Sequence, residues 1–264
     1  MSIITISRGS YSRGKEVAEK VAAALGYECI SREILLEASE QFNIPEIKLG
    51  RAIHDAPSIL ERFTYGKERY VAYIKAALMK HIQKDNVVYH GLAGHFFLQG
   101  IPHILKVRIV ADLDDRIAEE MKRENISADE ARHVLKKDDD ERRRWGIQVF
   151  GVDTWDPMLY DMVLHIKSLK VDDAVALILQ AAGMPCFQAT APSQKIIDDQ
   201  ALAARVQAAL VEEFPSAQVG AQAGEVFVDI RGDLAKEQEI IFRVRRIASH
   251  VAGIEVKVHY RIHP

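Results

Sequence analysis

The order of its apolar segments is the feature that most constrains how this chain folds. Short β-branched runs alternate with longer segments in which apolar residues recur every three or four positions, from Ile3–Ser7 to the stretch over 171–181. The short runs are typical of buried strands and the longer segments of amphipathic helices. Strands separated by helices form parallel βαβ units, so the sequence predicts an α/β domain whose parallel sheet is flanked by helices on both faces.

The predicted elements of this first region alternate along the chain. Asp112 precedes an amphipathic segment and is expected to cap it. Ser127 and Glu130 form a capping box at the start of a long charged helix. The stretch over 46–84 is expected to be mostly helical. The other strands are expected over 27–30, 86–89, 104–110 and 161–166, and the other helices over 14–25, 32–42, 112–123, 127–149 and 171–181.

The composition changes after residue 182, where this alternation stops. Residues 183–196 are rich in glycine, proline and small polar side chains, which is typical of a linker. A different order of elements follows: a helix over 198–214, paired strands over 218–219 and 225–230, a helix over 237–251 and a strand over 254–262. We therefore predict a first domain over 1–182, a linker over 183–196 and a second, small α+β (αββαβ) domain over 197–264.

Composition and charge exclude several classes of protein. The chain of 264 residues is too long for one minimal domain, and its formal net charge of −3 provides no overall basic field for binding nucleic acid. It shows neither a basic leader with a cleavage site nor an apolar run of the roughly 20 residues that cross a bilayer. Cys29 and Cys186 lie far apart and are expected to be reduced thiols. These features predict a cytoplasmic protein without an integral membrane segment.

The segment directly after the first predicted strand carries the strongest chemical signal. It has the pattern GxxxxGK between a strand and a helix, which is the pattern of a phosphate loop. In such a loop the backbone N–H groups and the helix N-terminus surround a phosphate, and the lysine adds a positive charge. The predicted phosphate-binding residues are Gly9, Ser10, Ser12, Arg13, Gly14, Lys15 and Glu16.

Glu16 stands where a serine or threonine usually holds magnesium, and two interpretations follow. In the first, the loop binds phosphate and Glu16 is the candidate Mg²⁺ ligand. In the second, the segment is an ordinary turn between strand and helix, where a glutamate is favourable beside the helix dipole. The position of the loop directly after the first strand favours phosphate binding.

Further segments occur in the order that is typical of one family. They are Ile3–Arg8, Gly14–Ala22, Ser31–Leu35, Val87–Ala93, Val107–Arg116, Asp138–Trp145 and Tyr160–Leu164. In these segments the chain resembles the cytidylate-kinase-like family, whose members are P-loop kinases of the nucleoside-monophosphate type. The resemblance covers about residues 1–182 and implies ATP and Mg²⁺ as cofactors.

The resemblance also implies the roles of individual residues. Lys15 would hold the donor phosphates, and Arg142 of a charged lid, supported by Arg116, would stabilise the transferring phosphoryl group. The implied acceptor-binding residues are Arg8, Ser31, Arg32 and Gly91. The lid segment has another interpretation, a solvated helix face with ion pairs between residues four positions apart, such as Asp138–Arg142.

Three hypotheses of function follow. The first is an ATP-dependent phosphotransferase that acts on a nucleoside monophosphate such as CMP. Ser31 replaces an acidic residue of the family and Leu92 replaces an arginine, so the second hypothesis is a nucleotide sensor without transfer activity. The third hypothesis, a structural interaction protein, requires the phosphate loop to be vestigial.

The C-terminal region carries its own resemblance. Val226–Gly232 forms a glycine-bounded strand pattern, and Val251–Val256 contains a Val-x-Gly-Ile turn. With these motifs, residues 197–262 resemble a BON domain, which implies association with a ligand, a membrane surface or a protein. We expect a regulatory role or homo-oligomerisation through this region, in addition to nucleotide binding by the first region.

Overall fold

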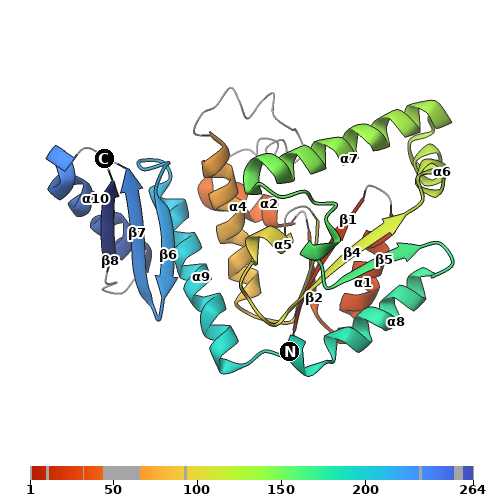
Figure 1. Cartoon of the computed structure of the whole chain (residues 1–264), viewed down its shortest axis with the longest axis horizontal. Helices are drawn as coiled ribbons and strands as arrows, with labels where there is room; N and C mark the ends of the chain where they lie inside the picture. The colour runs from red at the N-terminus through yellow and green to blue at the C-terminus, as the bar shows by residue number, and fades with distance from the viewer. Residues whose placement is uncertain are drawn as a thin grey trace. The chain divides into compact units, whose positions relative to one another are not determined.

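The computed structural model describes residues 2–9, 12–31, 33–43, 66–91, 94–231, 234–252 and 258–263 (Figure 1). These residues form two compact units that alternate along the sequence. The first unit contains the described residues up to Glu33 and those over 85–189. The second unit contains the described residues over 34–84 and from 190 onward. The predicted division into a domain over 1–182, a linker over 183–196 and a domain over 197–264 stays a prediction.

The first unit is built on a parallel sheet. Its strands have the order β2-β3-β1-β4-β5, and every neighbouring pair is parallel. This arrangement confirms the predicted α/β fold, and it places the end of β1 between β3 and β4. The bounds are Ile3–Arg8 for β1, Glu28–Ile30 for β2, Val87–His90 for β3, Ile104–Ala111 for β4 and Met162–Ile166 for β5.

Helices cover the sheet on both sides (Figure 1). On one face, α1 and α8 pack on the apolar side chains of β1 and β4, including Leu105, Val107 and Ile109. Side chains alternate between the two faces along a strand, so Arg108 and Val110 point to the opposite face. The helices of this unit are α1 (Gly14–Leu25), α5 (Gly94–Phe97), α6 (Leu113–Glu124), α7 (Ala128–Phe150) and α8 (Val171–Ala182), with the short helices η1 (Pro157–Leu159) and η2 (Pro185–Phe187).

The two predicted helix caps have different outcomes. Ser127 and Glu130 form the predicted capping box at the start of α7. Asp112 occupies the N-cap position of α6, but its side chain makes no capping hydrogen bond. Its carboxylate instead pairs with Lys167, and it lies 2.8 Å from His165 Nε2. The predicted N-cap position of Asp112 is therefore confirmed, while its side chain contacts His165 of β5 and Lys167 directly after that strand.

The second unit contains the C-terminal elements together with α2 (Glu33–Phe42) and α4 (Gly66–Ile82). Its sheet has the order β6-β7-β8, in which β6 and β7 are antiparallel and β7 and β8 are parallel. The order of elements confirms the predicted small αββαβ arrangement. The elements are α9 (Ala191–Leu210), β6 (Gln218–Gln222), β7 (Glu225–Arg231), η3 (Leu234–Lys236), α10 (Glu237–Ala252) and β8 (Val258–His263).

Helix α9 begins at Ala191, seven residues before the predicted start. Thr190 and Ser193 form a capping box, and a proline occupies the first turn, where its missing N–H group costs nothing. These residues had been assigned to the predicted linker. Of the predicted helical stretch over 46–84, residues 66–82 form α4, and residues 46–65 lie outside the described part. Among the described residues, no single helix is both long and apolar enough to cross a membrane.

Candidate functional site

The loop that follows β1 is fixed to the neighbouring strand by a serine. Ser12 is fully buried, and its Oγ lies 3.0 Å from the Gly9 carbonyl oxygen and 3.1 Å from the Ile109 carbonyl oxygen, to which it donates. Because Ile109 belongs to β4, this contact holds the loop at the carboxyl end of the sheet. The predicted loop residue Ser10 lies outside the described part of the chain.

Two features of the backbone shape the start of α1. Arg13 has a positive φ of 64°, a left-handed conformation that side chains other than glycine rarely adopt. At Gly14, an added Cβ would lie 2.6 Å from Arg8 Cβ. Glycine is therefore required at this position because α1 packs closely against the end of β1. The local geometry matches the close approach of strand and helix that a phosphate loop needs.

The cations of the loop and of the first turn of α1 are paired with carboxylates. Arg13 lies 3.2 Å from Glu16 and 3.2 Å from Glu119. Lys15 is exposed, and its Nζ lies 3.7 Å from Glu19 Oε1, one turn further along the helix. Exposed pairs of this kind are weak, so a bound phosphate could compete for these cations.

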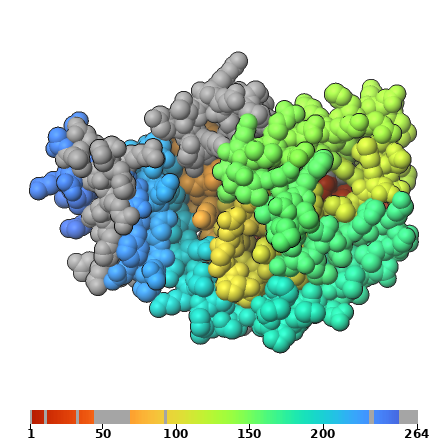
Figure 2. Space-filling model, in the orientation of Figure 1, coloured from red at the N-terminus to blue at the C-terminus, as the bar shows by residue number. Residues whose placement is uncertain are grey.

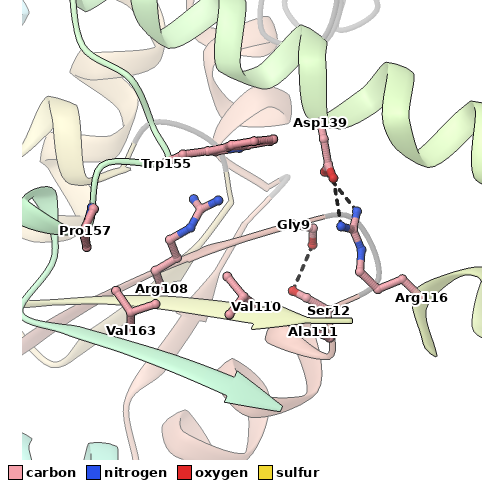
Figure 3. Close-up of a pocket in the computed structure, with 10 residues that line it drawn as sticks. All are labelled: Gly9, Ser12, Arg108, Val110, Ala111, Arg116, Asp139, Trp155, Pro157 and Val163. Atoms are coloured by element: carbon pink, nitrogen blue, oxygen red, sulfur yellow. Dashed lines mark hydrogen bonds and ion pairs between the residues drawn. The ribbon is translucent and has the colours of Figure 1, made fainter. Parts of the chain in front are cut away.

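A cavity of about 350 Å³ opens beside the loop (Figure 3). Strands β4 and β5 form one side, the Trp155 ring lies across the other, and α6 and α7 contribute an arginine–aspartate pair. In the space-filling view, the N-terminal segment is visible at the bottom of a hollow between α7 and the strands (Figure 2). The residues that line the cavity are Gly9, Ser12, Arg108, Val110, Ala111, Arg116, Asp139, Trp155, Pro157 and Val163.

Arg116 and Asp139 close the end of the cavity that is nearest the loop. The guanidinium and the carboxylate form a bidentate pair, with Nη1–Oδ2 and Nη2–Oδ1 distances of 2.8 and 3.0 Å. The two side chains are only 10% and 19% exposed, so the pair is weakly screened by water. Nearby, Arg142 Nη1 donates to the Arg8 carbonyl oxygen over 3.3 Å. The charged helix α7 therefore contributes Asp139 and Arg142 to this region.

Arg108 lies at the other end of the cavity, where its hydrogen-bond partners are hydroxyl groups. Its Nη1 donates to the Tyr160 hydroxyl over 3.3 Å and is 3.5 Å from Ser7 Oγ. Tyr160 in turn donates to the Thr154 carbonyl oxygen over 2.9 Å. His95 lies 3.4 Å from the same hydroxyl, and burial, together with the positive charge of Arg108, lowers the pKa of His95 to about 3. The histidine is therefore uncharged at neutral pH.

The loop that carries Trp155 is held by a second arginine of α7. Arg143 binds Asp153 through three contacts of 2.6 to 3.1 Å, and its Cζ lies 4.7 Å from the centre of the Trp155 ring. The hydrogen bonds from Arg143, followed by that from the Trp155 backbone, lower the pKa of Asp153. Asp153 also caps the Trp155 N–H over 3.0 Å. These contacts fix the backbone from which the indole extends.

Several predicted acceptor-binding residues lie away from this cavity. Gly91 follows β3, and its N–H donates to the Ile6 carbonyl oxygen over 3.3 Å. Ser31 follows β2, which is separated from β1 by β3. Arg32 and Leu92 lie outside the described residues. Their predicted roles stay predictions.

Sequence reasoning missed three residues of the cavity: Arg108, Asp139 and Trp155. Arg108 gave a signal, because it is one of two charged residues in the strand pattern over 104–110 and lies nearer to the end of the strand than Lys106 does. Asp139 was recognised only as part of the charged lid segment. Trp155 gave no periodic signal, because it lies in the irregular segment between α7 and β5.

Glu16, the predicted metal ligand, already has two cationic partners. Its carboxylate lies 3.2 Å from Arg13 and 3.4 Å from Lys20. Within the part of the chain that the structure describes, no group of three or more His, Cys, Asp or Glu side chains is placed to hold a metal ion. Mg²⁺ commonly keeps several waters and takes one or two carboxylates together with substrate phosphates, so a single carboxylate at the loop fits that ion.

The fold and the loop together define a class of protein. A parallel five-stranded sheet in the order β2-β3-β1-β4-β5, with a GxxxxGK loop between its first strand and helix, is the architecture of a P-loop kinase. A solved structure of an uncharacterised protein from Eubacterium ventriosum shares this fold. It has a TM-score of 0.53 and 23% sequence identity, and the match covers 69% of this chain and 98% of that chain.

The sequence comparisons then specify the family. The model of the Cytidylate kinase-like family matches residues 3–168, so the chain belongs to that family, as the resemblance predicted. A cytidylate kinase from Sulfolobus acidocaldarius is 25% identical over 179 residues, which cover 67% of this chain and 91% of the relative. A shikimate kinase from Bacteroides thetaiotaomicron matches 69% of this chain and 99% of its own, with 10% identity and a TM-score of 0.44.

Proposed function

We propose that the first unit is an ATP-dependent phosphotransferase that acts on a nucleoside monophosphate. The observation that carries this proposal is the cavity directly beside the phosphate loop, which Gly9, Ser12 and Arg116 line at one end. Membership of the cytidylate kinase-like family supports it, and the name of the Sulfolobus relative suggests a CMP-like acceptor. A cavity of about 350 Å³ lies within the usual range for small-molecule sites.

The proposed reaction is an in-line transfer. An oxygen of the acceptor phosphate attacks the γ-phosphorus of ATP and forms a new P–O bond. The bond between the γ-phosphorus and the β,γ-bridging oxygen breaks, and its electron pair leaves with ADP. The loop amides and Lys15 would hold the donor phosphates, and Arg116 and Arg142 would balance the charge that spreads over the transferring oxygens. Mg²⁺, held by those phosphates and by Glu16 through water, would supply further positive charge.

The test is ADP release from ATP and Mg²⁺ with CMP, dCMP, UMP, AMP and GMP as acceptors. We expect release that depends on the acceptor and falls at least a hundredfold in Lys15→Ala, because the lysine charge is removed from the phosphates. Lys122→Ala, which removes an exposed lysine of α6, is the matched control and should retain the rate. An unchanged rate in Lys15→Ala would contradict the proposal.

The second candidate is a nucleotide sensor without transfer activity. The observation that favours it is the pairing of Arg116 with Asp139, because the guanidinium proposed for the transferring phosphoryl group is held by a carboxylate of the chain itself. The replacement of the family arginine by Leu92 points in the same direction. Tight ATP binding measured by calorimetry, with no ADP release for any acceptor, would favour the sensor over the kinase.

For the second unit we propose association with a protein partner or a second copy of the chain, as the BON-like motifs imply. This unit exposes Phe227 on strand β7 and Phe242 on helix α10, which are 39% and 66% exposed. Exposed aromatic side chains of this kind are common at interfaces. Sedimentation of the full chain at increasing concentration, compared with a Phe242→Ser variant, tests the proposal. A monomer at all concentrations would argue against self-association.

A further inference from the structure

Helix α9, the first element of the C-terminal region, is buried on two opposite faces. One face, with Val206 and Leu210, packs on β7 of the small sheet and on α10. The other face has the helical spacing of a second buried stripe, and α9 contacts α4, which lies between β2 and β3 in the sequence. The C-terminal region is therefore joined to α4 by a packed helix pair. The buried residues of the second face are Ile197, Ala201, Ala204 and Ala208.

Polar side chains connect these two helices toward both ends. Where α4 ends and α9 begins, Gln194 Nε2 donates to the Gln83 carbonyl oxygen over 3.2 Å. Gln83 Nε2 donates in turn to Asp198 Oδ1 over 3.1 Å. Toward the other end, the Tyr73 hydroxyl donates to Glu212 Oε1 over 2.6 Å. The two helices are therefore antiparallel, and hydrogen bonds at two separate places fix α4 against the C-terminal region.

Tyr73 connects this helix pair to α2. The residue is only 3% exposed, and its ring stacks on Phe42 of α2 with 4.0 Å between the ring centroids. Burial, followed by the hydrogen bond to Glu212, raises the pKa of Tyr73, so the phenol keeps its proton and donates at neutral pH. Arg69 Nη1 also lies 3.1 Å from the Glu212 carboxylate. Tyr73 therefore contacts α2 through its ring and the C-terminal region through its hydroxyl.

Helix α2 is also bound to the C-terminal half of α4. Glu37 pairs with Lys80, and its Oε2 lies 2.5 Å from His81 Nε2. The helix begins at Glu33, shortly after the carboxyl end of β2. In open parallel sheets, ligands bind outside the carboxyl ends of the strands. The contacts that start at Glu212 therefore continue, through Tyr73 and α4, to the helix that follows this edge of the sheet.

We propose that Glu212 of the C-terminal region is a positioning residue for acceptor binding: through Tyr73 it holds α4 and α2 in the arrangement that the acceptor requires. The inference rests on the proposed phosphotransferase function and adds the C-terminal region to it. The family match ends at residue 168, so Glu212 lies outside the part of the chain that matches the family model. The phosphate loop follows β1, which β3 separates from β2, so ATP binding depends less on this contact.

The first test follows hydrogen exchange in the full chain without nucleotide. Glu212→Ala removes the acceptor of the Tyr73 hydroxyl. Glu213→Ala is the matched control, because Glu213 Oε2 lies 2.7 Å from Arg243 Nη2 of α10 instead. We expect exchange in α2 and α4 to rise about fivefold in Glu212→Ala, with no change in β1 and β4, and no rise in α2 and α4 in Glu213→Ala. Unchanged exchange in Glu212→Ala, or the same rise in β1 and β4 or in the control, would overturn the proposal.

The second test separates positioning from stability by kinetics. Glu212→Ala should raise the acceptor KM about fivefold and leave kcat and the affinity for ATP within about twofold. Tyr73→Phe, which keeps the ring but loses the hydroxyl, should have the same effect. Glu212→Gln should restore most of the acceptor KM, because its amide oxygen still accepts from Tyr73. A fall in kcat with an unchanged acceptor KM, or an equal rise of KM in Glu213→Ala, would overturn the proposal.

The outcomes separate this inference from the proposed function. Calorimetric titration with CMP measures acceptor binding without turnover. Faster exchange in α2 and α4 together with about fivefold weaker CMP binding in Glu212→Ala, without any ADP release by the wild type, would support the role of Glu212 and contradict the kinase. ADP release that depends on Lys15, with exchange and acceptor KM unchanged in Glu212→Ala, would support the kinase and contradict this inference.

Discussion

The two ends of the cavity contain the same type of side chain in opposite electrostatic states. At the loop end, Arg116 is bound on two atoms by Asp139. At the far end, Arg108 forms hydrogen bonds with the hydroxyls of Ser7 and Tyr160, and its Cζ lies 5.6 Å from the centre of the Tyr160 ring. One guanidinium is therefore held by a carboxylate at hydrogen-bond distance, and the other is held by hydroxyl groups. This difference teaches that the residue type alone does not identify a binding arginine; the neighbouring side chains decide.

The largest expected effect separates the two arginines by kinetics. Arg116→Ala should lower kcat about a hundredfold or more, because a charge beside the transferring phosphoryl group is lost. Arg108→Ala should instead leave kcat within about threefold, because Arg108 lies at the end of the cavity away from the phosphate loop. Steady-state rates at varied CMP and fixed ATP measure both values. Similar losses of kcat in the two variants would remove the functional distinction between the two ends.

The second prediction concerns stability. Arg116→Ala should cost about 2 kcal/mol in the free energy of unfolding, because the mostly buried Asp139 loses its partner. Arg108→Ala should change this free energy by less than about 1 kcal/mol, because the charge removed there was not paired. Urea unfolding provides the measurement, and a double-mutant cycle with Asp139→Ala isolates the pair. A larger loss of unfolding free energy for Arg108→Ala would show that the hydrogen bonds from Arg108 to the Ser7 and Tyr160 hydroxyls stabilise the fold.

The third prediction places acid sensitivity at the Arg108 end. The pKa of His95 is lowered from its ordinary value of 6.5 to about 3, mainly by burial. Below pH 6.5 the unfolded chain binds a proton that the folded chain does not, so stability falls as the pH falls, until about pH 3. Between pH 7 and 5.5 this group should cost about 1 kcal/mol. His95→Gln should remove that pH dependence, whereas His133→Gln, on the exposed side of α7, should retain it.

The smallest effect sharpens the comparison at the loop end. Asp139→Asn removes the charge that holds Arg116 and should strengthen ATP binding by about threefold, because phosphate no longer competes with a carboxylate. Calorimetric titration with ATP measures the change, and Asp129→Asn on an exposed turn of α7 is the control. Weaker ATP binding in Asp139→Asn would show that the aspartate orients Arg116 for the phosphate.

Much of the fold follows from local patterns, and the exceptions have local causes. The α/β alternation predicted the strands of the first unit within one or two residues, because each strand pattern is short, apolar and bounded by polar turns. The start of α9 was placed too late because Thr190, Ser193 and a proline look like linker residues until their capping role is recognised. Asp112 occupies the predicted N-cap position, but its carboxylate contacts Lys167 and His165, about fifty residues later in the chain, and forms no capping hydrogen bond.

By itself the sequence determined the phosphate loop, the parallel sheet and the family, because these depend on spacing along the chain and on side chains that alternate with a fixed period. Alternation alone also places Arg108 on the face opposite the apolar core of β4. Only the tertiary structure decided that Trp155 lies across from Val110 and Val163, that Asp139 holds Arg116, and that no carboxylate among the described residues holds Arg108. The physical reason is that these contacts join segments distant in sequence, and electrostatic balance at a site is a property of neighbours in space.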